Sequence, residues 1–217
     1  LSIFGTKYPR KNIDLSQFLI IFGTMLDLEI IKKKFKSGDI FFIADFTELG
    51  SYEAVRKSLQ RLTTEDEIGR IAKGIYFLPK KHERFGIVYP HAEQIAEAIA
   101  KRDKARIIPT GITALNKLGL STQMPLKVVY LTDGSARQIE VGNQTIQFKK
   151  TNPKNLSIDH RLSNLIIQAL KAIGEKNVSE EQIEKIQKII NDSQERELIY
   201  KNLFNAPVWM RKFIVTK

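Results

Sequence analysis

The chain has 217 residues, of which 42% are hydrophobic, so it can bury one large core or two smaller ones. Its 35 Lys and Arg residues exceed its 24 Asp and Glu residues and give a formal net charge of +11, which favours a polyanionic partner such as nucleic acid or acidic lipid. Cysteine is absent, which excludes disulfide bonds and thiolate metal sites, and no apolar run approaches the roughly 20 residues that span a bilayer. We expect a cytoplasmic protein without membrane contact.

The first regular pattern begins near Met25, the first methionine of the chain, and continues with Leu28, Ile31 and Phe35 at helical spacing. Residues 1–24 are therefore expected to be an N-terminal extension of unknown role. The next segment, "DIFFIADF" at residues 39–46, is aromatic and β-branched, which predicts a strand.

A helix-turn-helix is predicted by "TELGSYEAVRKSLQRL", residues 47–62. A short helix ends at Leu49, Gly50 supplies the turn, and a longer helix begins at Ser51. In such a motif the exposed N-terminal residues of the second helix face base edges in the major groove of DNA. The candidate DNA-binding residues on this helix are Ser51, Tyr52, Arg56, Lys57, Gln60 and Arg61.

Two short β-type runs, residues 68–72 and 75–78, flank Lys73 and Gly74. A hairpin directly after the second helix would complete a winged helix over residues 25–80 and place Arg70, Lys73 and Gly74 against the phosphate backbone. The same pattern is also consistent with an ordinary surface hairpin. The acidic "TEDE" at residues 64–67 is unexpected here, because carboxylates repel phosphates.

A linker is expected at residues 81–90, followed by a second domain over residues 91–217. Its patterns predict a helix, an extended segment, a short helix, the strand "LKVVYLTD", a hairpin and then helices to the end of the chain. Ser179 with Gln182, and Asp192 with Glu195, have the spacing of capping boxes. The expected fold class is α+β: an N-terminal winged helix-turn-helix domain, then an α/β C-terminal domain with a small sheet and terminal helices.

Most of the positive charge lies in the second domain, where residues 99–155 hold 10 basic and 3 acidic side chains. We interpret Lys127, Arg137, Lys149, Lys150 and Lys154 as a second basic face that binds an anion. Scattered, solvated lysines are the alternative. For "KRDKAR" at residues 101–106, a helix C-terminus that complements its own dipole is an equally open interpretation.

The order of several short motifs resembles a known family. They are "FFIADFTELGSYEAVRKSLQRL", "EIGRIAKGIYFLP", "PTG", "LGLSTQ", "YLTDG", "GNQTI" and a late "NAPVWM". Over residues 26–213 this order is similar to the AbiEi-type antitoxins of type IV toxin-antitoxin systems, which act in abortive infection, a form of phage defence. The winged-helix part alone is common to many regulators, whereas the middle motifs are far more specific.

The resemblance implies a transcriptional autorepressor that binds double-stranded promoter DNA through its N-terminal winged helix. It also implies a C-terminal antitoxin domain, residues 91–217, that counteracts a co-transcribed nucleotidyltransferase-like toxin. Antitoxins of this family oppose the toxin without a stable complex, so the toxin is expected to be a functional rather than a physical partner.

Two other functions remain open from the sequence. Asp133, Glu140 and Lys149 loosely match the two acids and lysine of Mg²⁺-dependent nucleases, and the second domain could instead sense a ligand for a transcription regulator. Against catalysis, the chain has no glycine-rich phosphate loop, no nucleophile elbow and no pair of histidines at metal-ligand spacing. We expect a protein that is not an enzyme and uses no catalytic residue, cofactor or metal.

Overall fold

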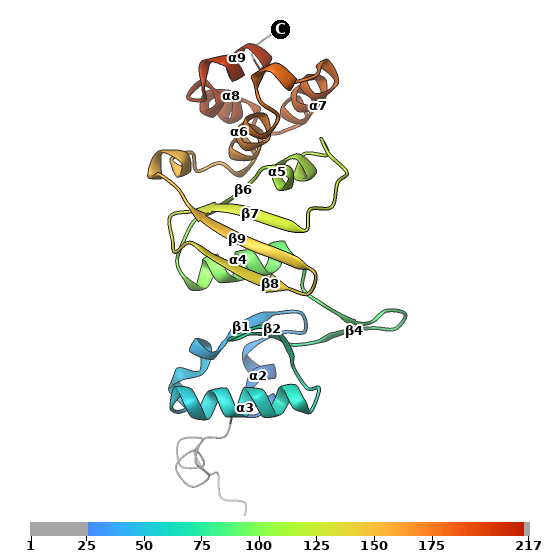
Figure 1. The fold of residues 1–217 in the computed structure, drawn as a ribbon, viewed down its shortest axis with the longest axis vertical. Helices are drawn as coiled ribbons and strands as arrows, with labels where there is room; N and C mark the ends of the chain where they lie inside the picture. Colours follow the sequence, from blue (N-terminus) through green and yellow to red (C-terminus); the bar gives the residue numbers. More distant parts are fainter. Residues whose placement is uncertain (1–25, 215–217) are drawn as a thin grey trace, which may run out of the picture. The chain divides into compact units, whose positions relative to one another are not determined.

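The computed structural model describes residues 26–214, so the expected extension at residues 1–24 lies outside the described residues. The chain divides into two compact units, residues 1–89 and 90–217, which are described separately below (Figure 1). Both contain helices and small sheets, which confirms the α+β class. Within residues 26–214, no helix is long and apolar enough to cross a membrane.

Unit 1 is built from helices packed on a three-stranded antiparallel sheet of order β1-β3-β2. Its elements are α2 (Leu28–Lys34), β1 (Ile40–Phe42), the 3₁₀ helix η1 (Ile43–Leu49), α3 (Tyr52–Thr64), β2 (Gly69–Ala72) and β3 (Ile75–Phe77). The strand predicted over residues 39–46 is therefore wrong in its second half. The Asp45 carboxylate accepts a hydrogen bond of 2.7 Å from the Phe42 amide, which stabilises a helical turn at this point.

The core of unit 1 joins one face of α3 to the sheet. Val55, Leu59 and Leu62 of α3 are at most 3% exposed, and they share this core with Phe41 and Phe46. The rings of Phe41 and Phe46 meet edge to face with centroids 5.7 Å apart. Since the buried residues of α3 recur at helical spacing, the core fixes the rotation of α3 about its own axis.

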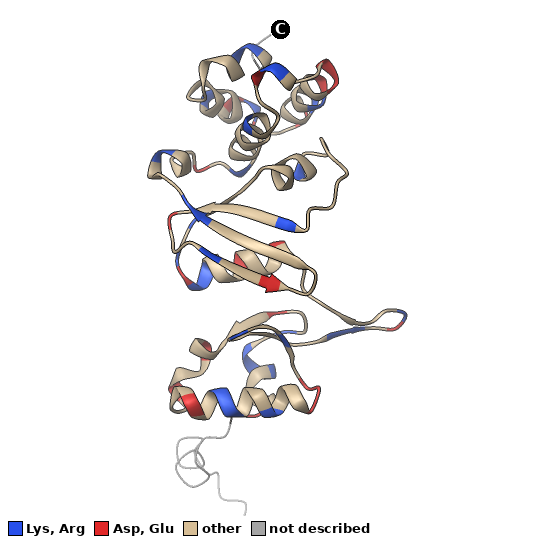
Figure 2. Ribbon diagram, viewed as in Figure 1, with Lys and Arg blue, Asp and Glu red and all other residues tan. Residues whose placement is uncertain are grey.

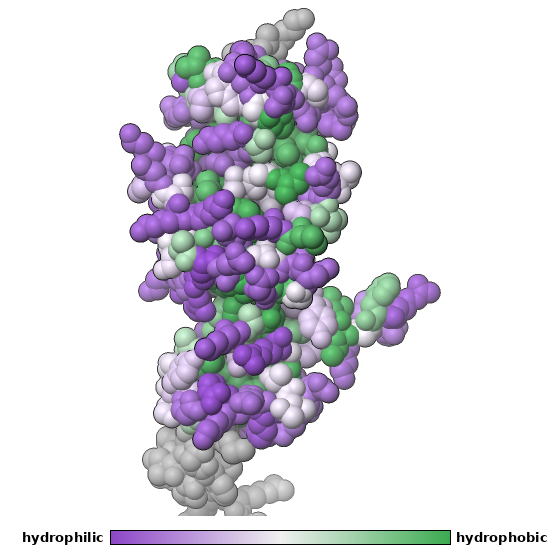
Figure 3. Space-filling model, in the orientation of Figure 1, coloured by the Kyte–Doolittle hydropathy of each residue, from purple (hydrophilic) through white to green (hydrophobic). Residues whose placement is uncertain are grey.

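Residues 81–90, expected to be a linker, mostly form a second hairpin. Strands β4 (Lys80–His82) and β5 (Gly86–Val88) pair with each other as a separate two-stranded sheet. All six strand residues are exposed, and Figure 3 shows apolar and hydrophilic side chains next to one another on this hairpin. The ring of Tyr89 lies 5.2 Å from that of Phe77, which anchors the hairpin to the end of β3. The two prolines that suggested a linker, Pro79 and Pro90, flank the hairpin.

Unit 2 contains a four-stranded sheet of order β6-β7-β9-β8. Its strands are β6 (Ile107–Thr110), β7 (Lys127–Thr132), β8 (Arg137–Val141) and β9 (Gln144–Lys150), and only the β7–β9 pair is parallel. Helix α4 (Ala92–Arg102) covers one face of this sheet (Figure 1). Ile146 and Phe148 of β9 are buried, as are Ile95 and Ile99 of α4.

The remaining helices of unit 2 form a second apolar core. They are α5 (Ile112–Lys117), α6 (Arg161–Ile173), α7 (Glu180–Asn191), α8 (Arg196–Phe204) and α9 (Val208–Ile214), with two short 3₁₀ turns, η2 (Pro153–Leu156) and η3 (Glu175–Asn177). The capping box of Ser179 and Gln182 is present in both directions. The one predicted at Asp192 is wrong, because Asp192 ends α7 instead of starting α8.

Gly69 gives a test of the packing in unit 1. A Cβ atom at this position would overlap the ring of Phe77, which is fully buried, so the ring would have to shift within the core. Gly69→Ala should therefore lower the free energy of unfolding by about 1–3 kcal/mol, measured by urea denaturation. If the cause is this ring, Phe77→Leu in the Gly69→Ala background should cost less than Phe77→Leu alone. Additive effects of the two changes would contradict the assignment.

Candidate nucleic-acid interface

A groove in unit 1 lies between α3 and the β2–β3 hairpin. Its volume is about 360 Å³. The lining residues are Ile43, Tyr52, Arg56, Gln60, Thr63, Thr64, Arg70, Lys73, Gly74 and Tyr76. Six of the nine predicted DNA-binding residues therefore meet here: Tyr52, Arg56, Gln60, Arg70, Lys73 and Gly74. They come from two segments of the chain, a helix and a hairpin that follows it.

Spacing along α3 explains which of its residues reach the groove. Tyr52, Arg56, Gln60 and Thr64 are four residues apart, so they form one stripe on the helix surface. Tyr52 is 61% exposed, which leaves its ring and hydroxyl accessible. The stripe adds Thr64, which the sequence analysis did not select, and the same spacing could have identified it.

Arg56 is held by an acidic neighbour on its own helix. Its guanidinium donates two hydrogen bonds to the Glu53 carboxylate, 3.0 Å from Nε to Oε2 and 2.5 Å from Nη2 to Oε1. This pairing lowers the pKa of Glu53, first through the side-chain hydrogen bond. Both side chains are solvent-accessible, so the pair is weak and can exchange for a phosphate contact.

Three predicted contact residues of α3 lie outside the groove. Ser51 caps the helix, since its hydroxyl oxygen accepts a hydrogen bond of 3.3 Å from the Ala54 amide. Arg61 lies on the other flank and pairs with Glu65 at 3.1 Å. Lys57 is exposed between the two flanks and makes no salt bridge with a described residue. The sequence pattern identified the exposed arc of the helix but not which flank meets the hairpin.

The hairpin directs both of its basic side chains toward the turn, since Lys73 stands in the turn and Arg70 Nε donates a hydrogen bond of 3.4 Å to the carbonyl of Ala72. Lys73 and Gly74 form the turn between Ala72 and Ile75, and Gly74 has a φ of +77°, a conformation that glycine adopts without strain. Arg70 and Lys73 are exposed. Neither makes a salt bridge within the part of the chain that the structure describes, so both are available to an anion.

The acidic loop lies at the opposite end of the hairpin. Asp66 and Glu67 line a separate hollow with Lys32, Lys36 and Lys81. They precede Gly69, which pairs with Phe77, whereas the Lys73–Gly74 turn adjoins Ile75. The loop that was unexpected beside a DNA-binding helix is thus separated from the turn by the length of β3.

Tyr76 is a groove residue that the sequence analysis missed. It is 3% exposed, and its ring stacks on Phe41 with centroids 6.1 Å apart. Burial raises its pKa, and nearby Arg70 opposes that shift. Its position in a continuous apolar run, "IYF", marks it as a core residue and gives no sign that it also lines the groove.

The five residues of the predicted second basic face do not form one surface. Lys127 pairs with Thr145 at the start of β7. Lys149 lies four residues further along β9, about 13 Å away at the usual rise of a strand, and Lys150 follows it. Arg137 forms an ion pair with Asp103, and its guanidinium lies 5.5 Å from the ring centroid of Phe148. Lys127 therefore lies apart from the other residues, whereas Arg137 is at the same end of the sheet as Lys149 and Lys150 but is paired with Asp103.

The nuclease arrangement of Asp133, Glu140 and Lys149 is not assembled. Asp133 accepts hydrogen bonds from the side chain and the amide of Arg106, at 2.9 and 2.7 Å, and these bonds lower its pKa. Glu140 accepts hydrogen bonds from the side chains of Gln138 and Thr145 instead. Among residues 26–214, no three His, Asp or Glu side chains are grouped so that they could hold a metal ion.

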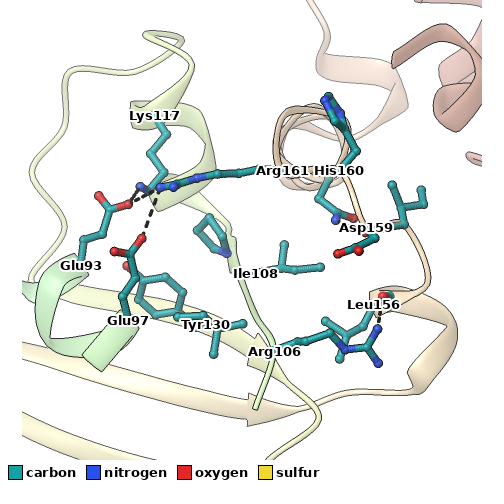
Figure 4. A pocket seen from close by; sticks show the side chains of 14 residues that line it. Glu93, Glu97, Arg106, Ile108, Lys117, Tyr130, Leu156, Asp159, His160 and Arg161 are labelled. Carbon is teal, nitrogen blue, oxygen red and sulfur yellow. Dashed lines mark hydrogen bonds and ion pairs between the residues drawn. The ribbon is translucent and has the colours of Figure 1, made fainter. Parts of the chain in front are cut away.

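Unit 2 has a pocket of about 390 Å³ between α4, β6 and the start of α6 (Figure 4). Glu93 accepts hydrogen bonds from Lys117 and Arg161, and Glu97 from Arg161 at 3.3 Å. Burial raises the pKa of Glu93, but the two cations lower it more. Glu93 and Glu97 are thus both paired with cations on this side of the pocket.

Comparison with known proteins gives a family. A model described as "Family of unknown function (DUF6088)" matches residues 27–198, which is most of the chain. The chain belongs to the DUF6088 family. Its structure is also similar to the RV2827C protein from Mycobacterium tuberculosis, with a TM-score of 0.47 and 11% identity over 84% of this chain and 71% of that one. No curated protein matches it.

The pocket of this DUF6088 protein contains an unusual hydroxyl group. Tyr130 is 2% exposed, lines the pocket, and has no hydrogen-bond partner for its hydroxyl among the described residues. Because an unpaired buried hydroxyl costs about 1–3 kcal/mol, Tyr130→Phe should leave the free energy of unfolding unchanged or raise it. Tyr200→Phe, which removes a hydroxyl that donates to Asn191, serves as the control. A loss above about 1 kcal/mol in Tyr130→Phe would show that the hydroxyl has a partner.

Proposed function

We propose that unit 1 is a winged helix that binds promoter DNA, with α3 as the recognition helix and the β2–β3 hairpin as the wing. The groove supports this proposal, because it brings together a helix stripe and a basic turn that are separate in sequence. In this proposal Tyr52 and Gln60 contact base edges. Arg70 and Lys73 neutralise phosphates.

The chemistry of the groove fits DNA better than a small metabolite. It is open to solvent along α3, and it carries three cationic side chains, Arg56, Arg70 and Lys73. None of its lining residues is acidic, and the carboxylate of Glu53 on the same helix is paired with Arg56. A surface of this kind suits an extended polyanion, whose backbone can follow both the helix and the turn.

We further propose that the protein is the antitoxin of a type IV toxin-antitoxin system. The order of motifs from "PTG" to "GNQTI" supports this role. In this proposal a cytoplasmic protein represses its own operon through unit 1 and counteracts a nucleotidyltransferase-like toxin through unit 2. The toxin is a functional partner and forms no stable complex with it.

DNA binding is tested with a fragment from upstream of its own gene. The logarithm of the affinity falls with the logarithm of salt concentration by about 0.9 for each phosphate contact. Lys73→Ala should therefore reduce the salt slope by about one, because it removes one such contact. Lys188→Ala, a change of an exposed lysine on α7, is the matched control. An unchanged slope in Lys73→Ala would remove the turn from the interface.

Antitoxin activity is tested separately by co-expression with the neighbouring toxin gene. The wild-type protein, expressed from an inducible promoter, should restore growth. An Arg70→Ala, Lys73→Ala variant should restore growth equally well, since the proposed antitoxin role lies in unit 2 and the promoter is foreign. Failure of the wild-type protein to restore growth would reject the antitoxin role and leave the DNA-binding proposal standing.

A further inference from the structure

Tyr130 contributes a buried hydroxyl without a partner to the pocket of unit 2. The residue lies within β7, where it pairs with Pro109 of β6 and Phe148 of β9, and it is 2% exposed. No described residue forms a hydrogen bond with its hydroxyl. Because nearly all buried polar groups in native proteins have a partner, an exception that lines a pocket is a candidate contact for a bound molecule.

Asn164 of α6 supplies a second buried polar group at the same pocket. It is 8% exposed, and its side-chain nitrogen donates a hydrogen bond to the carbonyl of Ile158. No described residue donates to its side-chain oxygen. Tyr130 thus offers a hydroxyl hydrogen, and Asn164 offers an acceptor. A ligand that satisfies both carries an acceptor at one place and an N–H or O–H donor at another.

The charges around Tyr130 disfavour an anion at its hydroxyl. Glu93 and Glu97 lie one turn apart on α4, whose basic residues are at its C-terminus (Figure 2). Burial raises the pKa of Tyr130 most, and each of these two carboxylates raises it more than Arg161 lowers it. The hydroxyl therefore lies in a negative potential. A neutral oxygen suits this position better than a carboxylate or a phosphate does.

The basic side chains of the pocket are already paired. Lys117 pairs with Glu93, and Arg161 pairs with Glu93 at 2.8 Å and with Glu97 at 3.3 Å. Arg106 pairs with a carboxylate outside the pocket at 2.9 Å. The Arg161 side chain is 76% exposed, so its ion pairs are weak and can part when a ligand enters. None of the three cations is left to hold an anionic ligand.

Asp159 is an acidic residue of the pocket that makes no salt bridge with a described residue. It is exposed, and it directly follows Ile158, the residue to which Asn164 is hydrogen-bonded. The Asp159 carboxylate and the Asn164 oxygen therefore lie at the same side of the pocket. Both are acceptors, and one is charged. An ammonium group, with its three N–H donors and positive charge, matches this pair.

Apolar residues lie between the two polar parts of the pocket. Figure 4 shows Ile108 between Tyr130 and Asp159. Ile108 and Leu156, which both line the pocket, are 6% and 2% exposed. The pocket volume of about 390 Å³ is near the lower end of the range for small-molecule sites. A ligand that fills it is therefore small and has an apolar body.

We propose that this pocket binds a small organic amine with an apolar body and a neutral oxygen. Its ammonium group contacts Asp159 and the side-chain oxygen of Asn164. Its body packs on Ile108 and Leu156, and its oxygen accepts a hydrogen bond from Tyr130. The amides of apolar amino acids have these three parts. The inference uses no residue of unit 1, so its failure leaves the proposed function standing.

The test titrates the full chain in a calorimeter with L-leucinamide and with L-phenylalaninamide. N-acetyl-L-leucinamide, which lacks the positive charge, and L-leucine, which has a carboxylate in place of the neutral amide, are the matched control compounds. Tyr130→Phe and Asp159→Asn each remove one proposed contact. Tyr200→Phe and Asp192→Asn are the matched control variants outside the pocket. Thermal melts check that every variant folds.

At least one of the two amides should bind saturably, and both control compounds should bind at least roughly tenfold more weakly. Tyr130→Phe should weaken the binding about fivefold and Asp159→Asn about threefold, while the control variants keep the wild-type affinity. The proposal is overturned if neither amide binds below about 10 mM, or if either control compound binds as tightly as L-leucinamide. Wild-type affinity in either pocket variant also overturns it.

Discussion

The burial of one stripe of α3 determines how the groove of unit 1 is composed. Val55, Leu59 and Leu62 must face the sheet, and this requirement fixes the rotation of the helix. Once the rotation is set, Tyr52 and Arg56 lie on the flank that meets the β2–β3 hairpin, and Arg61 lies on the other. The composition of the groove is thus a consequence of how α3 packs in the core. A core substitution that rotated α3 would change which of its polar residues line the groove, although it replaced none of them.

The positions of the charged residues in unit 2 likewise follow from its fold, through the pairing of its strands. The parallel pairing of β7 with β9 brings the end of β9 to the same end of the sheet as the start of β6, with β7 between them, and α4 leads into β6 at this end. Two basic segments that are nearly 50 residues apart in sequence thereby lie at the same end of the sheet. The arginines of this region are used in ion pairs with Asp103 and Asp133, so only lysines remain free. The resulting surface is strongly basic.

Local patterns predicted most elements well, because helix spacing and short β-type runs depend on neighbouring residues. They failed where a side chain acted on the backbone, as Asp45 does, or where exposed residues formed a hairpin without a core, as at residues 80–88. The groove was predictable in part, since six of its ten residues lie on a helix stripe or a turn. Tyr76 was not, because a buried residue in an apolar run gives no sign that its edge reaches a surface.

The second basic face shows the same limit more clearly. The sequence indicated an excess of positive charge. It could not show that Lys127 lies apart from Lys149, which depends on strand order, or that Arg137 is paired with Asp103. The parallel pairing of β7 with β9 cannot be recognised from local periodicity, because a strand has the same pattern of apolar residues whether its neighbour is parallel or antiparallel. The positions of the charges in unit 2 therefore depend on the topology of its sheet.

In unit 1 the local pairing of Arg56 with Glu53 also affects the charge of the groove. The Glu53 carboxylate offsets part of the charge of Arg56, so this arginine adds less to affinity than an unpaired one. Arg70 and Lys73 make no salt bridge to a described residue and supply the larger share of the attraction in the groove.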